Sequence, residues 1–139
     1  NSGKMLEKDY IMRLIRQFFE ALEKLIEKRE KGNETTLQME TNGMYRGYFH
    51  QPQEFFYEAS MDIILAYMQA RFPEEERLQR IELLAELMHF DASLKSSEET
   101  QTALEQKALE LLNFADTHSD TFSFGRRQKM KEIEDFLKP

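Results

Sequence analysis

Apolar residues return at intervals of three and four along most of the chain, which is the spacing of an α-helix that buries one face. The first such segment runs from Leu6 to Lys31, and Gly32 marks its expected end. Met12, Phe19 and Ile26 widen its apolar arc, so we expect this helix to contact neighbours on two sides. Its main apolar face comprises Ile11, Leu14, Ile15, Phe18, Leu22 and Leu25.

Two further helices are predicted in the middle of the chain. Ser60 is a suitable N-cap for a helix from about Met61 to Arg71, because a serine oxygen can accept a hydrogen bond from a free amide of the first turn. Pro73 starts the next helix, which extends to Ser93 and begins with three glutamates that suit the positive end of the helix dipole. Its apolar face comprises Leu78, Ile81, Ala85, Met88 and Ala92.

Two more helices are predicted in the last third of the chain. Ser96 and Glu99 have the spacing of a capping box, in which each side chain satisfies a free backbone amide. After a polar break, Ser123 can cap the last helix, with Phe122 folding back on it as a hydrophobic staple. The apolar residues that follow the capping box at helical intervals are Ala103, Leu104, Ala108, Leu111, Leu112 and Ala115.

The stretch from Glu34 to Phe49 fits two structures. Asn42-Gly43 between apolar residues suits a two-residue hairpin turn, whereas Leu37 and Tyr48 also fit one face of a helix. We predict a helix, because an isolated hairpin is marginally stable and the flanking segments are helical. A short β-ribbon is the alternative.

The composition indicates a single helical domain over residues 5–139, with residues 1–4 as a remnant of an expression tag. A chain of 139 residues can bury a core without disulfides. The absence of cysteine removes thiolate metal sites and thiol nucleophiles and favours a cytoplasmic protein. The apolar runs are too short to cross a membrane, and a net charge of -7 disfavours nonspecific binding to nucleic acid.

Two sets of motifs resemble known families. Residues 105–112 (Glu-Gln-Lys-Ala-Leu-Glu-Leu-Leu) resemble the second helix of a tetratricopeptide unit, with the helix of residues 74–93 as its partner. Residues 9–13 (Asp-Tyr-Ile-Met-Arg), 107–112 and 124–127 (Phe-Gly-Arg-Arg) together resemble a small bacterial family of unknown function. These resemblances imply an all-α, tetratricopeptide-like stack of antiparallel helix hairpins with about six helices. They imply no substrate, partner or site residue.

Glu86 and His89 are the candidate metal ligands, because a Glu-x-x-His pair places a carboxylate and an imidazole on adjacent turns of a helix. A di-iron bundle needs a second such pair, and the sequence has one, so we predict no metal and no other cofactor. The three histidines are scattered, and neither a nucleophile motif nor a glycine-rich phosphate loop is present. We therefore predict that the protein is not an enzyme.

Basic residues are concentrated near the last helix, at Arg126, Arg127, Lys129 and Lys131, beside two phenylalanines. This arrangement can form a patch that stacks on bases and binds phosphates. Three acidic residues of the same segment dilute its charge, so we predict no nucleic-acid partner.

Aromatic residues are densest in the middle of the chain, and aromatic residues together with arginine dominate the hot spots of protein interfaces. We therefore predict a groove for a protein or peptide partner there. The predicted function is a protein-interaction or scaffolding module, with self-association through the first helix as one form. The alternative is a ligand- or metal-binding helical bundle with an enzymatic role. The predicted contact residues are Tyr45, Arg46, Tyr48, Phe56, Tyr67 and Arg71.

Overall fold

The computed structural model describes the backbone of residues 2–139 and the side chains from Lys8 onward. Over these residues the chain forms α-helices and no strand, which confirms the all-α prediction. The β-ribbon alternative for residues 34–49 is wrong, since this segment forms a helix. The helices are α1 (Ser2–Glu30), α2 (Leu37–Phe49), α3 (Gln53–Glu58), α4 (Met61–Arg71), α5 (Glu74–Ala92), α6 (Glu98–His118) and α7 (Phe124–Leu137).

The helix starts follow the predicted capping chemistry, with two corrections. Ser60 and Ser123 accept hydrogen bonds from the third amide of α4 and α7, as predicted. For α6 the cap is Ser97 and not Ser96, because the backbone stays extended through Ser97 and its oxygen accepts from the amide of Thr100 at 3.1 Å. Phe122 does not form a hydrophobic staple, since its ring is 68% exposed and lies under the Arg127 guanidinium.

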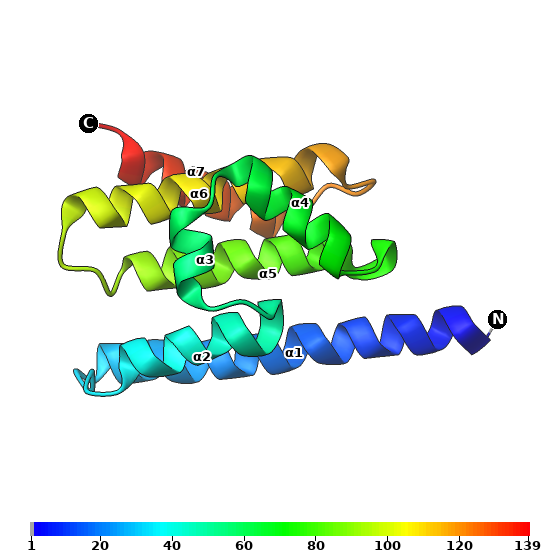
Figure 1. Cartoon of the computed structure of the whole chain (residues 1–139), viewed down its shortest axis with the longest axis horizontal. Coiled ribbons are helices and arrows are strands. Elements are labelled where there is room, and N and C mark those ends of the chain that lie inside the picture. Colours follow the sequence, from blue (N-terminus) through cyan, green and yellow to red (C-terminus); the bar gives the residue numbers. More distant parts are fainter. Residues whose placement is uncertain (1) are drawn as a thin grey trace.

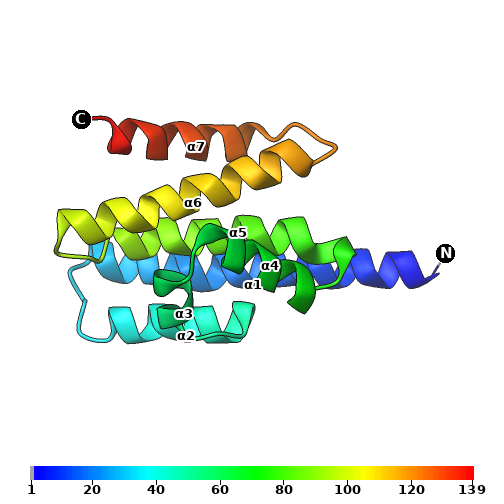
Figure 2. The same ribbon diagram turned by 45° about the horizontal axis from the view of Figure 1, so that its top comes forward.

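α5 is the central helix of the fold and packs against α1, α2, α4 and α6. Its buried residues extend around most of its circumference, which is why it has neighbours on several sides. The pairs α1–α2, α5–α6 and α6–α7 are antiparallel neighbours in Figures 1 and 2. This arrangement contains antiparallel helix hairpins, while the tetratricopeptide-like character of the stack stays a prediction.

A buried carboxylate joins three helices at the centre of this core. Asp91 on α5 has no exposed surface and accepts hydrogen bonds from Tyr45 Oη at 2.8 Å and Gln38 Nε2 at 3.1 Å, both on α2. It also accepts one from the hydroxyl of Tyr57 on α3, and Lys95 Nζ lies 3.3 Å from it. Burial and this carboxylate raise the pKa of Tyr45 well above its ordinary value, so its hydroxyl remains a donor.

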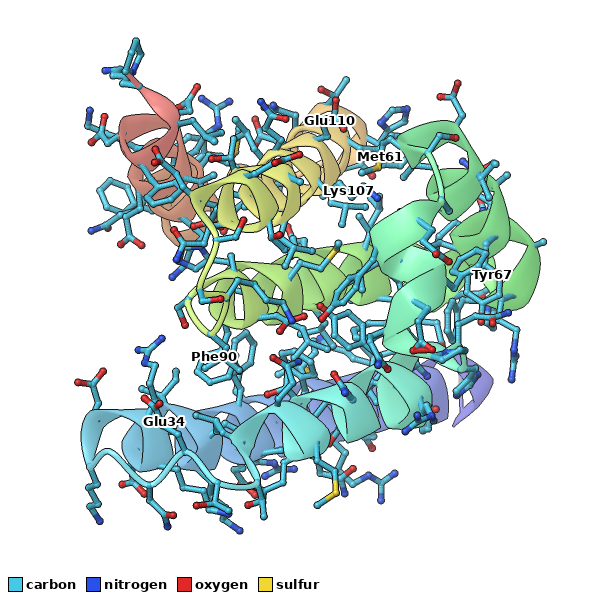
Figure 3. All side chains as sticks on the ribbon, turned by 60° about the vertical axis from the view of Figure 1, so that its left-hand side comes forward. Glu34, Met61, Tyr67, Phe90, Lys107 and Glu110 are labelled. Carbon is cyan, nitrogen blue, oxygen red and sulfur yellow. The ribbon has the colours of Figure 1, made fainter. Side chains whose placement is uncertain are left out.

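The short helix α3, which the sequence analysis did not predict, is held by a lysine from α6. Lys107 Nζ donates to the carbonyls of Phe56 at 2.9 Å, Tyr57 at 2.7 Å and Ala59 at 2.8 Å. These carbonyls lie at the C-terminal end of α3, where a cation satisfies acceptors that the helix itself leaves unpaired. In Figure 3, Lys107 points from α6 towards this segment.

The remaining helices lie on opposite sides of the α5–α6 pair. In Figure 3, α4 is on the right and α7 is on the left of this pair. α7 packs mainly on α6, whereas α1 packs mainly on α2 and α5. α1 and α7 therefore flank α5 without forming a main contact with each other, and a hollow surface follows α5 between them.

Candidate functional site

The predicted partner groove in the aromatic middle of the chain is largely core. Tyr45 and Phe56 have no exposed surface, so neither can contact a partner, and both predictions are wrong. Their rings stack with centroids 5.6 Å apart, and Tyr45 uses its hydroxyl on Asp91. Aromatic residues at helical spacing supply a large apolar area, and here the Tyr45 and Phe56 rings use it in the core.

The other four predicted contact residues do not form one surface. Tyr48 is half-buried and lines a shallow hollow between α1 and α2. Tyr67 is half-buried and donates its hydroxyl to the carbonyl of Phe49 at 2.6 Å. Arg46 and Arg71 are exposed, on α2 and α4 respectively. The structure therefore does not bring these four residues together into one contact surface.

The basic residues near α7 are paired with carboxylates. Arg126 is buried and lies 2.7 Å from Glu82 and 2.8 Å from Asp116. Arg127 also contacts Asp116, and Lys129 and Lys131 have acidic neighbours within 4 Å. These ion pairs neutralise most of the local positive charge and fix the first turn of α7 to α5 and α6.

A concave surface lies between α1 and α7, with α5 as its floor, and is called the α1–α7 trough below. It consists of two adjoining hollows of about 270 and 310 Å³, and Glu86 lines both of them. The apolar residues of the smaller hollow are Ile15, Phe19, Leu83 and Leu112, and those of the larger hollow are Leu22, Ile26, Phe90, Ala92 and Phe136. Figure 3 shows Phe90 between α5 and α1.

The α1 wall of the trough has the spacing of a coiled-coil seam. Ile15, Phe19, Leu22 and Ile26 line the trough at alternating intervals of four and three residues, the pattern by which one helix packs along another. With Arg29 at the far end, the wall extends for roughly 21 Å at 1.5 Å per residue. This is the length of a docked helix of about four turns.

The polar part of the larger hollow contains Glu86 and His89, the candidate metal ligands. His89 Nδ1 lies 2.7 Å from the carboxylate of Glu105, which is buried, so this pair orients the imidazole. Glu86 lines the same hollow one turn away, and Lys129 Nζ is 3.8 Å from it. Among the residues whose side chains are described, no group of three or more metal-binding side chains converges.

Glu86 is the least satisfied charge of the trough. Burial raises the pKa of its carboxyl, and Lys129 opposes this shift only partly. No hydrogen bond to Glu86 is present among the described side chains, so its charged form loses water without gaining a donor. A group of this kind weakens the fold and is typical of a binding surface.

Replacing Glu86 with glutamine is therefore expected to raise the melting temperature at about pH 7 and to change it little at about pH 4. A carboxyl whose pKa is raised on folding supports the folded state at low pH, and this contribution is lost as the pH rises through the raised pKa. Thermal unfolding of dilute protein at both pH values measures the effect. Glutamate to glutamine at exposed Glu132 is the control, and an equal change at both pH values for Glu86 would contradict the prediction.

Comparison of the chain with protein-family models, curated proteins and solved structures finds no match. The proposals below therefore depend on the geometry of the trough. In addition, no helix over the described residues is both long and apolar enough to cross a membrane.

The trough itself was not predicted from the sequence, and the residues of its α1 wall were expected to contact neighbouring helices. The widened apolar arc of the first helix, with Phe19 and Ile26, was the available signal for the α1 wall. Leu83, Phe90 and Phe136 belong to helices whose relative placement no local pattern specifies. Their convergence depends on tertiary packing of α5, α6 and α7.

Proposed function

We propose that this chain is a protein-interaction module that receives an amphipathic helix in the α1–α7 trough. The observation that carries the proposal is the coiled-coil spacing of apolar residues on α1, from Ile15 to Ile26, opposite the α7 wall with Phe136. Phe19 is 40% and Phe136 is 47% exposed. Apolar side chains aligned along a groove are the usual receptor for the apolar face of a helix.

The dimensions of the trough favour a helix over a small ligand. Each hollow is at or below the lower limit of small-molecule sites in volume, and the two adjoin at Glu86 and together follow α1 for several turns. An extended trough of this kind suits side chains that recur every three or four residues along a docked helix. The partly buried hydrogen bond between His89 and Glu105 contributes a polar edge to the same site.

Selection from a displayed library of amphipathic helical peptides of about 20 residues would test the proposal. We expect enriched peptides to bind wild-type protein at least about tenfold more tightly than Phe136→Glu, because a charge in the α7 wall opposes apolar docking. Met39→Glu is the matched control, since Met39 is 66% exposed on α2 and lies outside the trough. It should leave the affinity unchanged.

A second measurement locates the bound peptide. Hydrogen exchange in the complex should slow for amides of α1, α5 and α7 and should be unaltered in α4, on the other side of the molecule. Failure to enrich any helical peptide, or binding that Phe136→Glu leaves intact, would reject the trough as the interaction site.

A further inference from the structure

α1 itself carries a helix face with the chemistry that the trough requires. Met12, Arg16 and Phe19 lie on one side of α1, separated by four and three residues. Met12 is 58% exposed, and Arg16 is exposed and has no carboxylate within ion-pair distance in the described part of the chain. This face therefore presents a cation between two large apolar side chains. These three residues are called the α1 stripe below.

The trough has the complementary arrangement. Glu86 lies where its two apolar hollows meet, and it lacks a hydrogen-bond donor among the described side chains. A docked helix therefore binds most tightly if one of its arginines reaches Glu86. Apolar residues one turn away on either side of that arginine should fill the hollows. The α1 stripe has this order of side chains.

The N-terminal half of α1 is also accessible to another molecule. In Figures 1 and 2, this end of α1 extends beyond the ends of the neighbouring helices. Met12, Arg16 and Phe19 are exposed on α1, so their side chains are free to contact a second molecule. Exposed apolar residues that lie together are typical of interaction sites.

We propose that the occupant of the trough is the α1 helix of a second copy of this chain, which forms a two-fold symmetric dimer with Arg16 of each copy paired with Glu86 of the other. This inference depends on the proposed function of the trough as a helix receptor. In an antiparallel α1–α1 pair whose two-fold axis passes beside Phe19, the second copy's Arg16 lies opposite Leu22. That position is next to Glu86, which adjoins both Phe19 and Leu22 along the trough.

Symmetry makes the two contacts identical. In a two-fold interface the same surface acts on both molecules, so each α1 is at once a wall of its own trough and the helix that occupies the other trough. The two Phe19 rings meet near the axis, and the Met12 side chain of each copy lies towards the larger hollow of the other. In one dimer, both apolar hollows are filled, Arg16 gains a carboxylate partner and Glu86 gains a hydrogen-bond donor.

Sedimentation velocity of the full chain over a range of concentrations tests the proposal. We expect wild-type protein to dimerise, and Arg16→Glu to weaken the dimer at least about tenfold, because two like charges then face each other at each of two sites. Arg13→Glu is the matched control. Arg13 is equally exposed on the same helix but lies outside the α1 stripe, so its substitution should leave the dimer intact.

Mixing two variants gives the decisive measurement. Glu86→Arg alone should dimerise more weakly than wild type, like Arg16→Glu alone, since each variant opposes like charges. Their equimolar mixture should form a heterodimer with an affinity within about threefold of wild type, because both contacts in the mixed dimer again join opposite charges. Circular dichroism of each variant establishes that it is folded. If Glu86→Arg does not fold, Glu86→Gln replaces it, and this variant should weaken the dimer less.

Three outcomes would overturn the proposal. Wild-type protein that stays monomeric at millimolar concentration excludes the second copy as occupant, and if helical peptides still bind the trough, the proposed function survives. A dimer insensitive to Arg16→Glu uses another surface. A dimer that Arg16→Glu disrupts but that the mixture does not restore involves α1 without the Arg16–Glu86 contact.

Discussion

Replacing Asp91 with alanine is expected to lower the free energy of unfolding by about 3–5 kcal/mol, since it removes the common acceptor of a buried polar network. The hydroxyls of Tyr45 and Tyr57 and the amide of Gln38 would each lose a hydrogen bond. The Lys95 ammonium would lose its carboxylate partner. Asp91 and Tyr45 have no exposed surface, so the Tyr45 hydroxyl cannot replace its lost partner with water at little cost.

Denaturant unfolding of Asp91→Ala, monitored by circular dichroism, measures this effect. Asp91→Asn keeps the shape of the side chain and should cost less than alanine, because one amide oxygen still accepts hydrogen bonds. Asp135→Ala removes a carboxylate that is exposed and paired with lysines, and should change stability by less than about 0.5 kcal/mol. Equal changes in the free energy of unfolding for Asp91→Ala and Asp135→Ala would show that the buried network does not stabilise the fold.

The helices that the sequence predicted best are those with strong local signals at both ends. α4 and α5 begin within one residue of their predicted starts, because Ser60 and Pro73 fix these positions through capping and backbone geometry. α3 has six residues and no periodic stripe, and its stability depends on Lys107 of a distant helix. Local pattern therefore could not predict it.

The candidate site was harder to predict, since a sequence pattern shows which residues share a face and not what that face contacts. Tyr45 belongs to the aromatic face of α2, and its contacts with Asp91 on α5 and Phe56 on α3 make it core. Phe19 and Ile26 were expected to serve a second contact of the first helix, and the structure leaves them along the trough. The opposite wall depends on where α7 packs, which no local signal specifies.

Replacing Arg126 with methionine is expected to lower the free energy of unfolding by about 2–3 kcal/mol and to loosen the α7 wall of the trough. Arg126 is buried and donates to Glu82 on α5, to Asp116 on α6 and to the carbonyl of Thr121. Methionine fills a similar volume but leaves both carboxylates without this donor. The first turn of α7 would then lose its attachment to both neighbouring helices.

Arg127→Met provides a matched control, because Arg127 is the next residue of the same helix and contacts the same Asp116 carboxylate at 2.8 Å. Its side chain is 55% exposed, so its loss should cost less than about 0.5 kcal/mol. Hydrogen exchange should accelerate in α7 of Arg126→Met alone, with little change in α1 and α2. Helix docking in the trough should weaken in parallel, since Phe136 needs an ordered α7 to form its wall. Uniform acceleration across the chain would instead mean that α7 unfolds only together with the whole domain.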